Sequence, residues 1–217
     1  MNLFHLEFGA LLTYSPRGTT PSAIHSKGVM QALKRDQYVG NPPTILMSEW
    51  VAGKLQQKMA ELPFAFFFHP NSILVPVPKS SLMQPNTLWV PERIANALVS
   101  VGIGEQVASC LIRAKAVPKA ALSSPSERPT AEQHYESISV QGSLRKPDEI
   151  VLIDDIVTRG ATLIGCANRL TDAFPQCHIR AFAAMRTISN PNEFDSVYSP
   201  CIGTIDLYET GDTFRRP

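Results

Sequence analysis

Residues 150–163 read Ile-Val-Leu-Ile-Asp-Asp-Ile-Val-Thr-Arg-Gly-Ala-Thr-Leu, and this stretch decides the fold class. Its apolar start predicts a buried strand over 149–153, and the apolar spacing after it predicts a helix over 162–174 that Pro175 ends. A second apolar strand is expected over 178–185. A strand, a helix and a strand in this order imply a parallel pair of strands within an α/β domain.

Apolar periodicity on either side of this stretch predicts the other elements of one domain. We expect strands over 8–14, within 72–78 and over 138–140, and helices over 24–35, over 48–61 with Ser48 as N-cap, and from Pro91 onward. A chain of 217 residues corresponds to a single domain with additions. The expected domain is 1–217, with a core of about 44–187 and with terminal segments as hood or edge elements.

Composition and charge exclude several classes of protein. Twenty Lys and Arg residues against nineteen Asp and Glu residues leave a net charge of +1, so no bulk binding of nucleic acid is expected. No apolar stretch near the N-terminus is long enough to span a membrane, and Glu7 interrupts any signal-peptide core. We therefore expect a cytoplasmic protein without a membrane partner. The cysteines form no metal-binding pattern and are expected to be reduced: Cys110, Cys166, Cys177 and Cys201.

Two adjacent carboxylates and a small hydroxyl-bearing turn form the candidate site. Asp154 and Asp155 stand at the carboxyl end of the predicted strand, where ligands bind in open parallel sheets. Residues 158–162 lead into the helix, so their backbone amides and two threonine hydroxyls suit a phosphate group. The two features together indicate a ribose 5-phosphate. The alternative is an ordinary strand end with an N-capping threonine.

The stretch from Ile150 to Leu163 resembles the phosphoribosyl-pyrophosphate-binding motif of type I phosphoribosyltransferases, and the chain is most similar to the ComF-type, competence-associated members of that family. Weaker similarity runs through 73–79 and 128–140. The resemblance implies a Rossmann-like parallel sheet flanked by helices, a small hood that holds the acceptor, and a flexible lid loop.

The resemblance also implies roles for individual residues. Asp154 and Asp155 would be catalytic, and they would contact the ribose hydroxyls directly or through Mg²⁺. The basic lid segment would add Lys119 and Arg128 to the catalytic residues. The 5-phosphate would be held by Thr158, Arg159, Gly160, Ala161 and Thr162, and the pyrophosphate by Lys79, Ser80 and Ser81.

This sequence departs from the family pattern at two places. It lacks the N-terminal four-cysteine zinc ribbon that ComF-type proteins often carry, so attachment to DNA by that route is unsupported. Arg159 stands where the family commonly has a threonine, and its guanidinium either contacts an anion or points to solvent. Three further features each have a structural alternative to the functional role. Lys79 is then a solvated surface lysine, and the basic segment is a solvated surface loop. His134 is then a structural histidine and does not contact the acceptor.

The function implied by the resemblance is transfer of a phosphoribosyl group from phosphoribosyl pyrophosphate to a nitrogen of a base-like acceptor, with Mg²⁺ and with release of pyrophosphate. The alternative is a binding or regulatory module of the same fold without turnover, such as a nucleotide sensor or a protein of the DNA-uptake machinery. A homodimer is plausible for the family. The sequence does not identify the acceptor.

Overall fold

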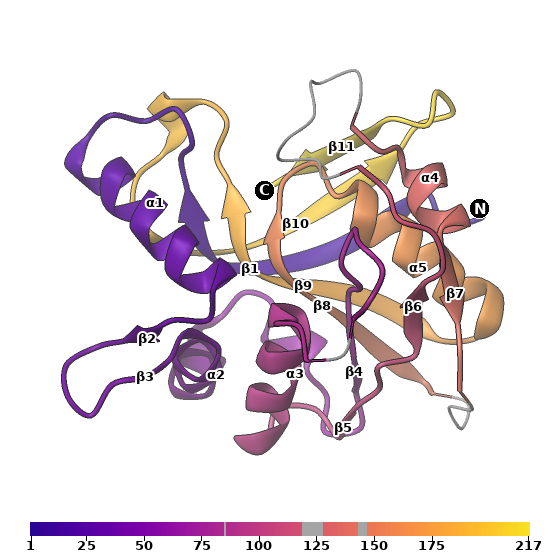
Figure 1. Cartoon of the computed structure of the whole chain (residues 1–217), viewed down its shortest axis with the longest axis horizontal. Helices are drawn as coiled ribbons and strands as arrows, with labels where there is room; N and C mark the ends of the chain where they lie inside the picture. Colours follow the sequence, from indigo (N-terminus) through magenta and orange to yellow (C-terminus); the bar gives the residue numbers. More distant parts are fainter. Residues whose placement is uncertain (85, 119–127, 143–146) are drawn as a thin grey trace.

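The structure is a computed structural model that describes residues 1–84, 86–118, 128–142 and 147–217. A seven-stranded sheet forms its centre (Figure 1). The strand order is β11 (Thr213–Arg216), β10 (Tyr198–Leu207), β1 (His5–Tyr14), β9 (His178–Thr187), β8 (Glu149–Val157), β4 (Ile73–Pro76) and β5 (Gln106–Val107). The strands from β1 to β5 in this order run parallel, whereas β10 and β11 are antiparallel additions beside β1. The expected α/β fold with a mostly parallel sheet is confirmed.

Helices pack on both faces of this sheet. One face carries α1 (Pro21–Lys34), α2 (Met47–Lys58) and α3 (Val90–Ser100), and the other carries α4 (Ala131–Glu136) and α5 (Ala161–Ala173). Small two-stranded sheets pair β2 (Tyr38–Val39) with β3 (Ile45–Leu46) and β6 (Leu111–Arg113) with β7 (Ile138–Val140), and short 3₁₀ helices cover Met59–Glu61, Ala65–Phe67 and Pro191–Glu193. Strand β8 supplies Leu152 to one core and Ile153 to the other. A strand covered on both faces needs apolar residues without alternation, which explains its sequence.

The carboxyl end of β8 extends further than the sequence pattern predicts. Pairing with β4 ends at Pro76 opposite Ile153, but pairing with β9 continues to Val157 opposite Arg186. Asp154 therefore lies just beyond the end of one neighbouring strand while the other neighbour still holds its backbone. This stagger brings the aspartates to the edge of the sheet on a rigid element.

Two expectations differ from the structure. Strand β1 lies inside the sheet between β9 and β10, so the expected core limits of 44–187 leave out a central strand. Ser48 does not cap α2, because the cap position is Leu46 and the amide of Ser48 donates to Asp36 Oδ1 at 2.8 Å. The buried carboxylate of Asp36 thus accepts a hydrogen bond from this helix start, where the sequence predicted that Ser48 would be the cap.

The strand expected over 138–140 is present as β7, and the ordered helix α4 lies just before it, where no regular element was expected. Thr130 caps α4 by accepting a hydrogen bond from the amide of Gln133 at 3.2 Å. The expected lid loop itself falls mainly on 119–127, outside the described residues. Among the described helices, none is long and apolar enough to cross a bilayer.

Candidate functional site

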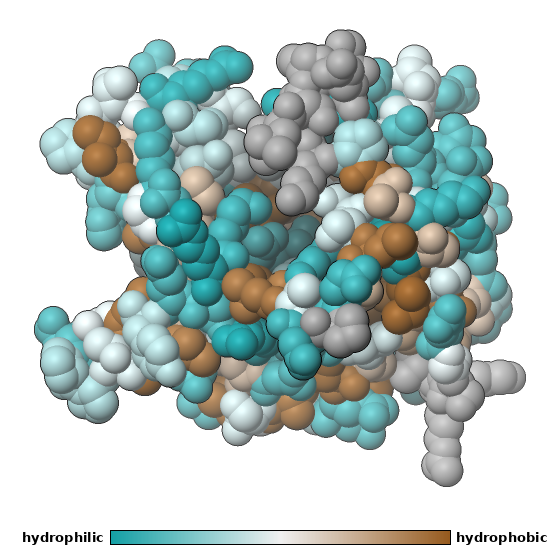
Figure 2. All heavy atoms as spheres, in the orientation of Figure 1, coloured by the Kyte–Doolittle hydropathy of each residue, from teal (hydrophilic) through white to brown (hydrophobic). Residues whose placement is uncertain are grey.

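The carboxyl ends of the parallel strands meet at one edge of the sheet, where the candidate site lies. Strands β8 and β4 separate at this edge, because the amide of Val77 makes the last contact, with the carbonyl of Ile153 at 2.9 Å. Asp154 follows directly. Figure 2 shows that the molecular face in this view is hollowed between α1 and α4.

The two aspartates are oriented by the strand that carries them. The amide of Asp155 donates to Asp154 Oδ1 at 2.9 Å, and the amide of Ile156 donates to Asp155 Oδ1 at 2.8 Å. The second oxygen of Asp155 lies 3.7 Å from Lys34 Nζ. The carboxyl groups of Asp154 and Asp155 also lie within hydrogen-bond reach of each other. Each side chain is thus oriented at one oxygen by a backbone amide, and the second oxygen of Asp155 has Lys34 beside it.

Asp154 is hard to ionise when no cation is bound. Burial, and after it the charge of Asp155, raise the pKa of Asp154 well above its ordinary value of 3.8. The hydrogen bond from the Asp155 amide and the charge of Lys34 act in the opposite direction. A divalent cation beside the pair would relieve this repulsion, so the two carboxylates fit a cation.

The turn of residues 158–162 approaches β10 closely. Gly160 adopts a left-handed backbone with φ of +88°, and a Cβ atom there would stand 2.6 Å from Ile205 Cδ1. Both facts require glycine at this position. Gly160 is also the N-cap residue of α5, and it offers no side chain to the amides of the first helical turn.

The amides at this helix start are available to a ligand. No acceptor among the described residues binds the N–H groups of residues 158–163, and the first helical bond runs from Ile164 to the carbonyl of Gly160. Helix N-termini carry a partial positive charge and favour anions. No threonine caps this helix start, since Gly160 is the N-cap, and the role of residues 158–162 in holding a phosphate stays a prediction.

The two threonine hydroxyls of the turn already have protein neighbours. Thr158 Oγ1 lies 3.2 Å from Thr187 Oγ1, and Thr162 Oγ1 lies 3.2 Å from His134 Nε2. A hydroxyl both donates and accepts, so each can still contact a ligand. The threonines are oriented by these contacts.

His134 reaches Thr162 because α4 packs tightly on α5. A Cβ at Gly165 would lie 2.7 Å from His134 Cβ, so only glycine permits this approach. Burial, and then the nearby charge of Arg113, lower the pKa of His134 to about 4. Arg113 Nη2 lies 3.5 Å from His134 Nδ1, and a guanidinium only donates, so the proton of the neutral ring is on Nε2 and faces Thr162. These contacts favour the structural alternative for His134.

The residues expected to hold pyrophosphate follow β4 at the same edge as the aspartates. Lys79 Nζ donates to Thr87 Oγ1 at 2.9 Å, and its carbonyl accepts from Arg113 Nε at 2.8 Å. The carbonyl of Ser80 accepts from the amide of Val117 at 2.9 Å, and Ser81 is exposed. No described contact joins these side chains to the aspartates, so their role stays a prediction.

The remaining expected residues are placed as follows. Arg159 is half-buried in the turn and has no described hydrogen-bond partner, which leaves both readings of its guanidinium open. Arg128 lies just before α4, and its buried Nε has no hydrogen-bond partner among the described residues. Lys119 lies outside the described residues. The four cysteines are free, and no cluster of three or more potential metal ligands occurs in the described part of the chain.

Comparison with known proteins does not assign a family. No family model matches the sequence, and no curated protein matches it. One similar solved structure is a hypoxanthine phosphoribosyltransferase from Staphylococcus aureus, with 10% sequence identity, a TM-score of 0.33 and a match over 70% of each chain. A likeness at this level supports no conclusion about activity, which has to come from the geometry of the site.

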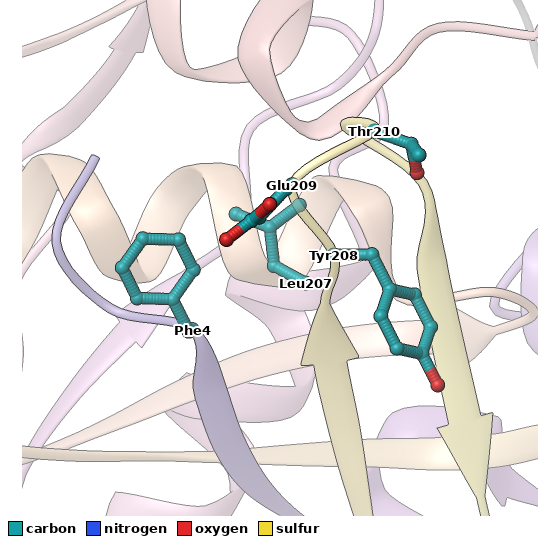
Figure 3. Close-up of a pocket in the computed structure, with 5 residues that line it drawn as sticks. All are labelled: Phe4, Leu207, Tyr208, Glu209 and Thr210. Carbon is teal, nitrogen blue, oxygen red and sulfur yellow. The ribbon is translucent and has the colours of Figure 1, made fainter.

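One cavity borders the helix that reaches Asp155, and a second lies away from the site. One, of about 500 Å³, lies beside α1 and is mainly apolar; its lining includes Gly28, Ala32, Trp50 and Tyr198. The other, of about 640 Å³, lies between Phe4 and the turn after β10 (Figure 3). Phe4 precedes β1, so this second cavity is at the opposite edge of the sheet from the aspartates.

Sequence reasoning missed Lys34, Arg186 and Arg215, which all approach the site. Lys34 ends the first helix, and its only sequence signal was a basic residue at a helix terminus. Arg215 comes from the last strand, which had no recognisable pattern before the fold was known. Both reach the site by tertiary packing, which spacing along the chain does not report.

Proposed function

We propose that this protein binds 5-phosphoribosyl 1-pyrophosphate with Mg²⁺ and transfers the phosphoribosyl group to a nitrogen of a base-like acceptor, releasing pyrophosphate. One observation carries the proposal: the uncapped start of α5 follows Asp154 and Asp155 at the carboxyl edge of the sheet. A phosphate on the amides of 158–163 would direct the ribose hydroxyls toward the two carboxylates.

The residues of this chain would act by binding and orientation. The 158–162 turn would anchor the 5-phosphate, and Asp154 and Asp155 would orient the ribose through their carboxylate oxygens. Fixing the sugar in this way aligns the anomeric carbon with the acceptor and lowers the entropic part of the barrier. Lys79 and Lys34 would bring positive charge toward the leaving pyrophosphate.

The Mg²⁺ requirement fits the residues present. Two carboxylates without a third potential metal ligand among the described residues suit an ion that takes its other ligands from water and substrate oxygens. When bound, Mg²⁺ would neutralise charge that develops on the pyrophosphate oxygens. Asp154 and Asp155 are the residues that would hold it, directly or through water.

The apolar cavity beside α1 is the proposed acceptor pocket. It has a volume of about 500 Å³, enough for a planar base, and Trp50 and Tyr198 supply aromatic walls. The helix that forms one side of the cavity ends in Lys34, which contacts Asp155. The same helix therefore borders both the cavity and the carboxylate pair.

Calorimetry tests the binding step. The parent protein should bind phosphoribosyl pyrophosphate in the presence of Mg²⁺, and the Asp154→Asn/Asp155→Asn variant should bind it at least tenfold more weakly, because two charged contacts are lost. Equal affinity in the two proteins would refute the proposed site. A folded variant is confirmed by an unfolding transition as cooperative as that of the parent.

Turnover is tested separately by pyrophosphate release with purine, pyrimidine and pyridine bases. Release with one of them supports the transferase. Tight binding of phosphoribosyl pyrophosphate without release for any acceptor would instead support the binding or regulatory module.

A further inference from the structure

The C-terminal hairpin of β10 and β11 contacts the turn of residues 158–162, here called the phosphate turn, through one arginine. Arg215 Nε donates to the carbonyl of Thr158 at 2.7 Å, and Arg215 Nη2 donates to the carbonyl of Thr187 at 2.6 Å. Thr158 directly follows β8, and Thr187 is the last residue of β9. A single guanidinium therefore joins the ends of two parallel strands. Its third nitrogen, Nη1, is buried and has no hydrogen-bond partner among the described residues.

A second arginine lies beside the first. Arg186 is only 8% exposed and pairs in register with Val157 at the end of β8. Its Nη2 lies 3.4 Å from Ser199 Oγ, and its buried Nε has no described partner. Burial, and after it the charge of Arg186, lower the pKa of Arg215.

No carboxylate compensates this pair. Within the described residues, neither Arg186 nor Arg215 forms a salt bridge, although neighbouring Arg216 pairs with Asp206 at 2.8 Å. Arg186 is buried and Arg215 is half-buried, and two positive charges side by side in such places are costly unless an anion offsets them. This uncompensated pair of arginines lies next to the turn of residues 158–162, whose backbone amides are available to a ligand.

The same hairpin also shapes the turn sterically. Ile205 of β10 fills the space where a side chain at position 160 would stand. The hairpin therefore contacts the turn at Gly160 through packing and at Thr158 through a charged hydrogen bond. Neither contact was visible in the sequence motif.

We propose that Arg215 is a positioning residue for the turn of residues 158–162 and that, with Arg186, it strengthens the binding of a phosphate there. This inference rests on the proposed function, because it assumes that a phosphate binds the turn. Arg215 holds the Thr158 carbonyl away from the ligand and keeps the neighbouring amides directed toward it. The charges of both arginines act through the turn without touching the phosphate.

Ribose 5-phosphate and Mg²⁺-pyrophosphate are the probes, because each reports on one half of the site. In calorimetry, Arg215→Gln should weaken ribose 5-phosphate binding about tenfold, the size of one charge-assisted contact, and leave Mg²⁺-pyrophosphate binding unchanged. Arg215→Lys should recover only part of the affinity, because lysine keeps the charge and cannot bridge both carbonyls. Arg216→Gln, on the same strand, is the matched control and should bind like the parent.

The outcomes separate this inference from the proposed function. If the parent binds neither probe, the proposed function fails. If the parent binds ribose 5-phosphate and Arg215→Gln binds it equally well, the role of Arg215 is refuted. If Arg215→Gln loses both probes together, the damage is general and the specific role is again refuted. Should Arg215→Gln not fold, Arg186→Gln, which leaves both carbonyl contacts in place, should weaken ribose 5-phosphate alone by several-fold, and an unchanged affinity would overturn the proposal.

Discussion

Lys34 Nζ lies 3.7 Å from Asp155 Oδ2, so the last residue of α1 places a positive charge beside the carboxylate pair. Lys34 is half-exposed, and this contact is therefore weak and easily exchanged. In the absence of substrate, the ammonium group stands where a divalent cation would compete for the same oxygen.

Replacing Lys34 should make the free protein bind Mg²⁺ more tightly. We expect Lys34→Gln to lower the Kd for Mg²⁺ alone about two- to fivefold, which is the size of a partly exposed ion pair. Lys54→Gln is the control, since Lys54 donates to Gln57 on the exposed surface of α2. Calorimetric titration with MgCl₂ measures the change, and an unchanged or weaker affinity in Lys34→Gln would contradict the competition.

Filling the apolar cavity should block the acceptor without affecting the phosphate site. A side chain at Gly28 has no atom within 4 Å of its Cβ and would project into the space beside α1, so Gly28→Leu should raise the KM for the acceptor at least tenfold. The affinity for phosphoribosyl pyrophosphate should stay the same. Gly53→Leu is matched, because Gly53 also lies inside a helix with no neighbour within 4 Å and does not line the cavity.

Both glycine variants should stabilise the protein by about 0.5–1 kcal/mol, because leucine has the higher helix propensity. This shared gain separates the effect on the acceptor from an effect on folding. Equal KM values for the acceptor in the two variants would place the acceptor elsewhere.

Asp154 should destabilise the protein as the pH rises. Its pKa is raised in the folded state, so the unfolded chain releases the proton first and stability falls between pH 3.8 and the raised pKa. Asp154→Asn removes this loss and should melt at a higher temperature than the parent at pH 7, by about 2–4 °C for each kcal/mol gained. The difference should vanish near pH 4. Thermal melts from pH 4 to 8 check the trend, and a parent that melts higher than the variant at pH 7 would contradict it.

His134 should have the opposite pH dependence. Its pKa of about 4 lies below the ordinary 6.5, so protonation favours the unfolded chain and stability is lost as the pH falls from 6.5 toward 4. The full effect is roughly 3 kcal/mol. Urea unfolding should show a smaller loss between pH 7 and pH 4.5 for His134→Gln than for the parent. In NMR titrations the ring of His134 should not protonate above pH 5, and a midpoint near 6.5 would show that it is not buried.

Much of the fold followed from local pattern. The strands and helices between 149 and 187 were predicted because a sheet covered on both faces demands continuous apolar strands, and Pro175 has to end the helix before it. Strands β10 and β11 were missed, since Tyr198–Leu207 alternates only weakly and its role depends on pairing with β1. The N-cap of α2 was assigned wrongly because the group that binds the Ser48 amide, Asp36, is supplied by another part of the chain.

The candidate site divides in the same way. Asp154, Asp155 and the turn around Gly160 lie within nine residues, and their order along one strand, turn and helix is enough to predict where carboxylates and amides point. Lys34 and Arg215 lie far from them in sequence, and only the folded sheet brings these charges within hydrogen-bond or ion-pair range. The sequence was therefore enough to place these carboxylates and amides together at one strand end, because their geometry is local. The tertiary structure alone decided which cations surround them, because charges interact through space and not along the chain.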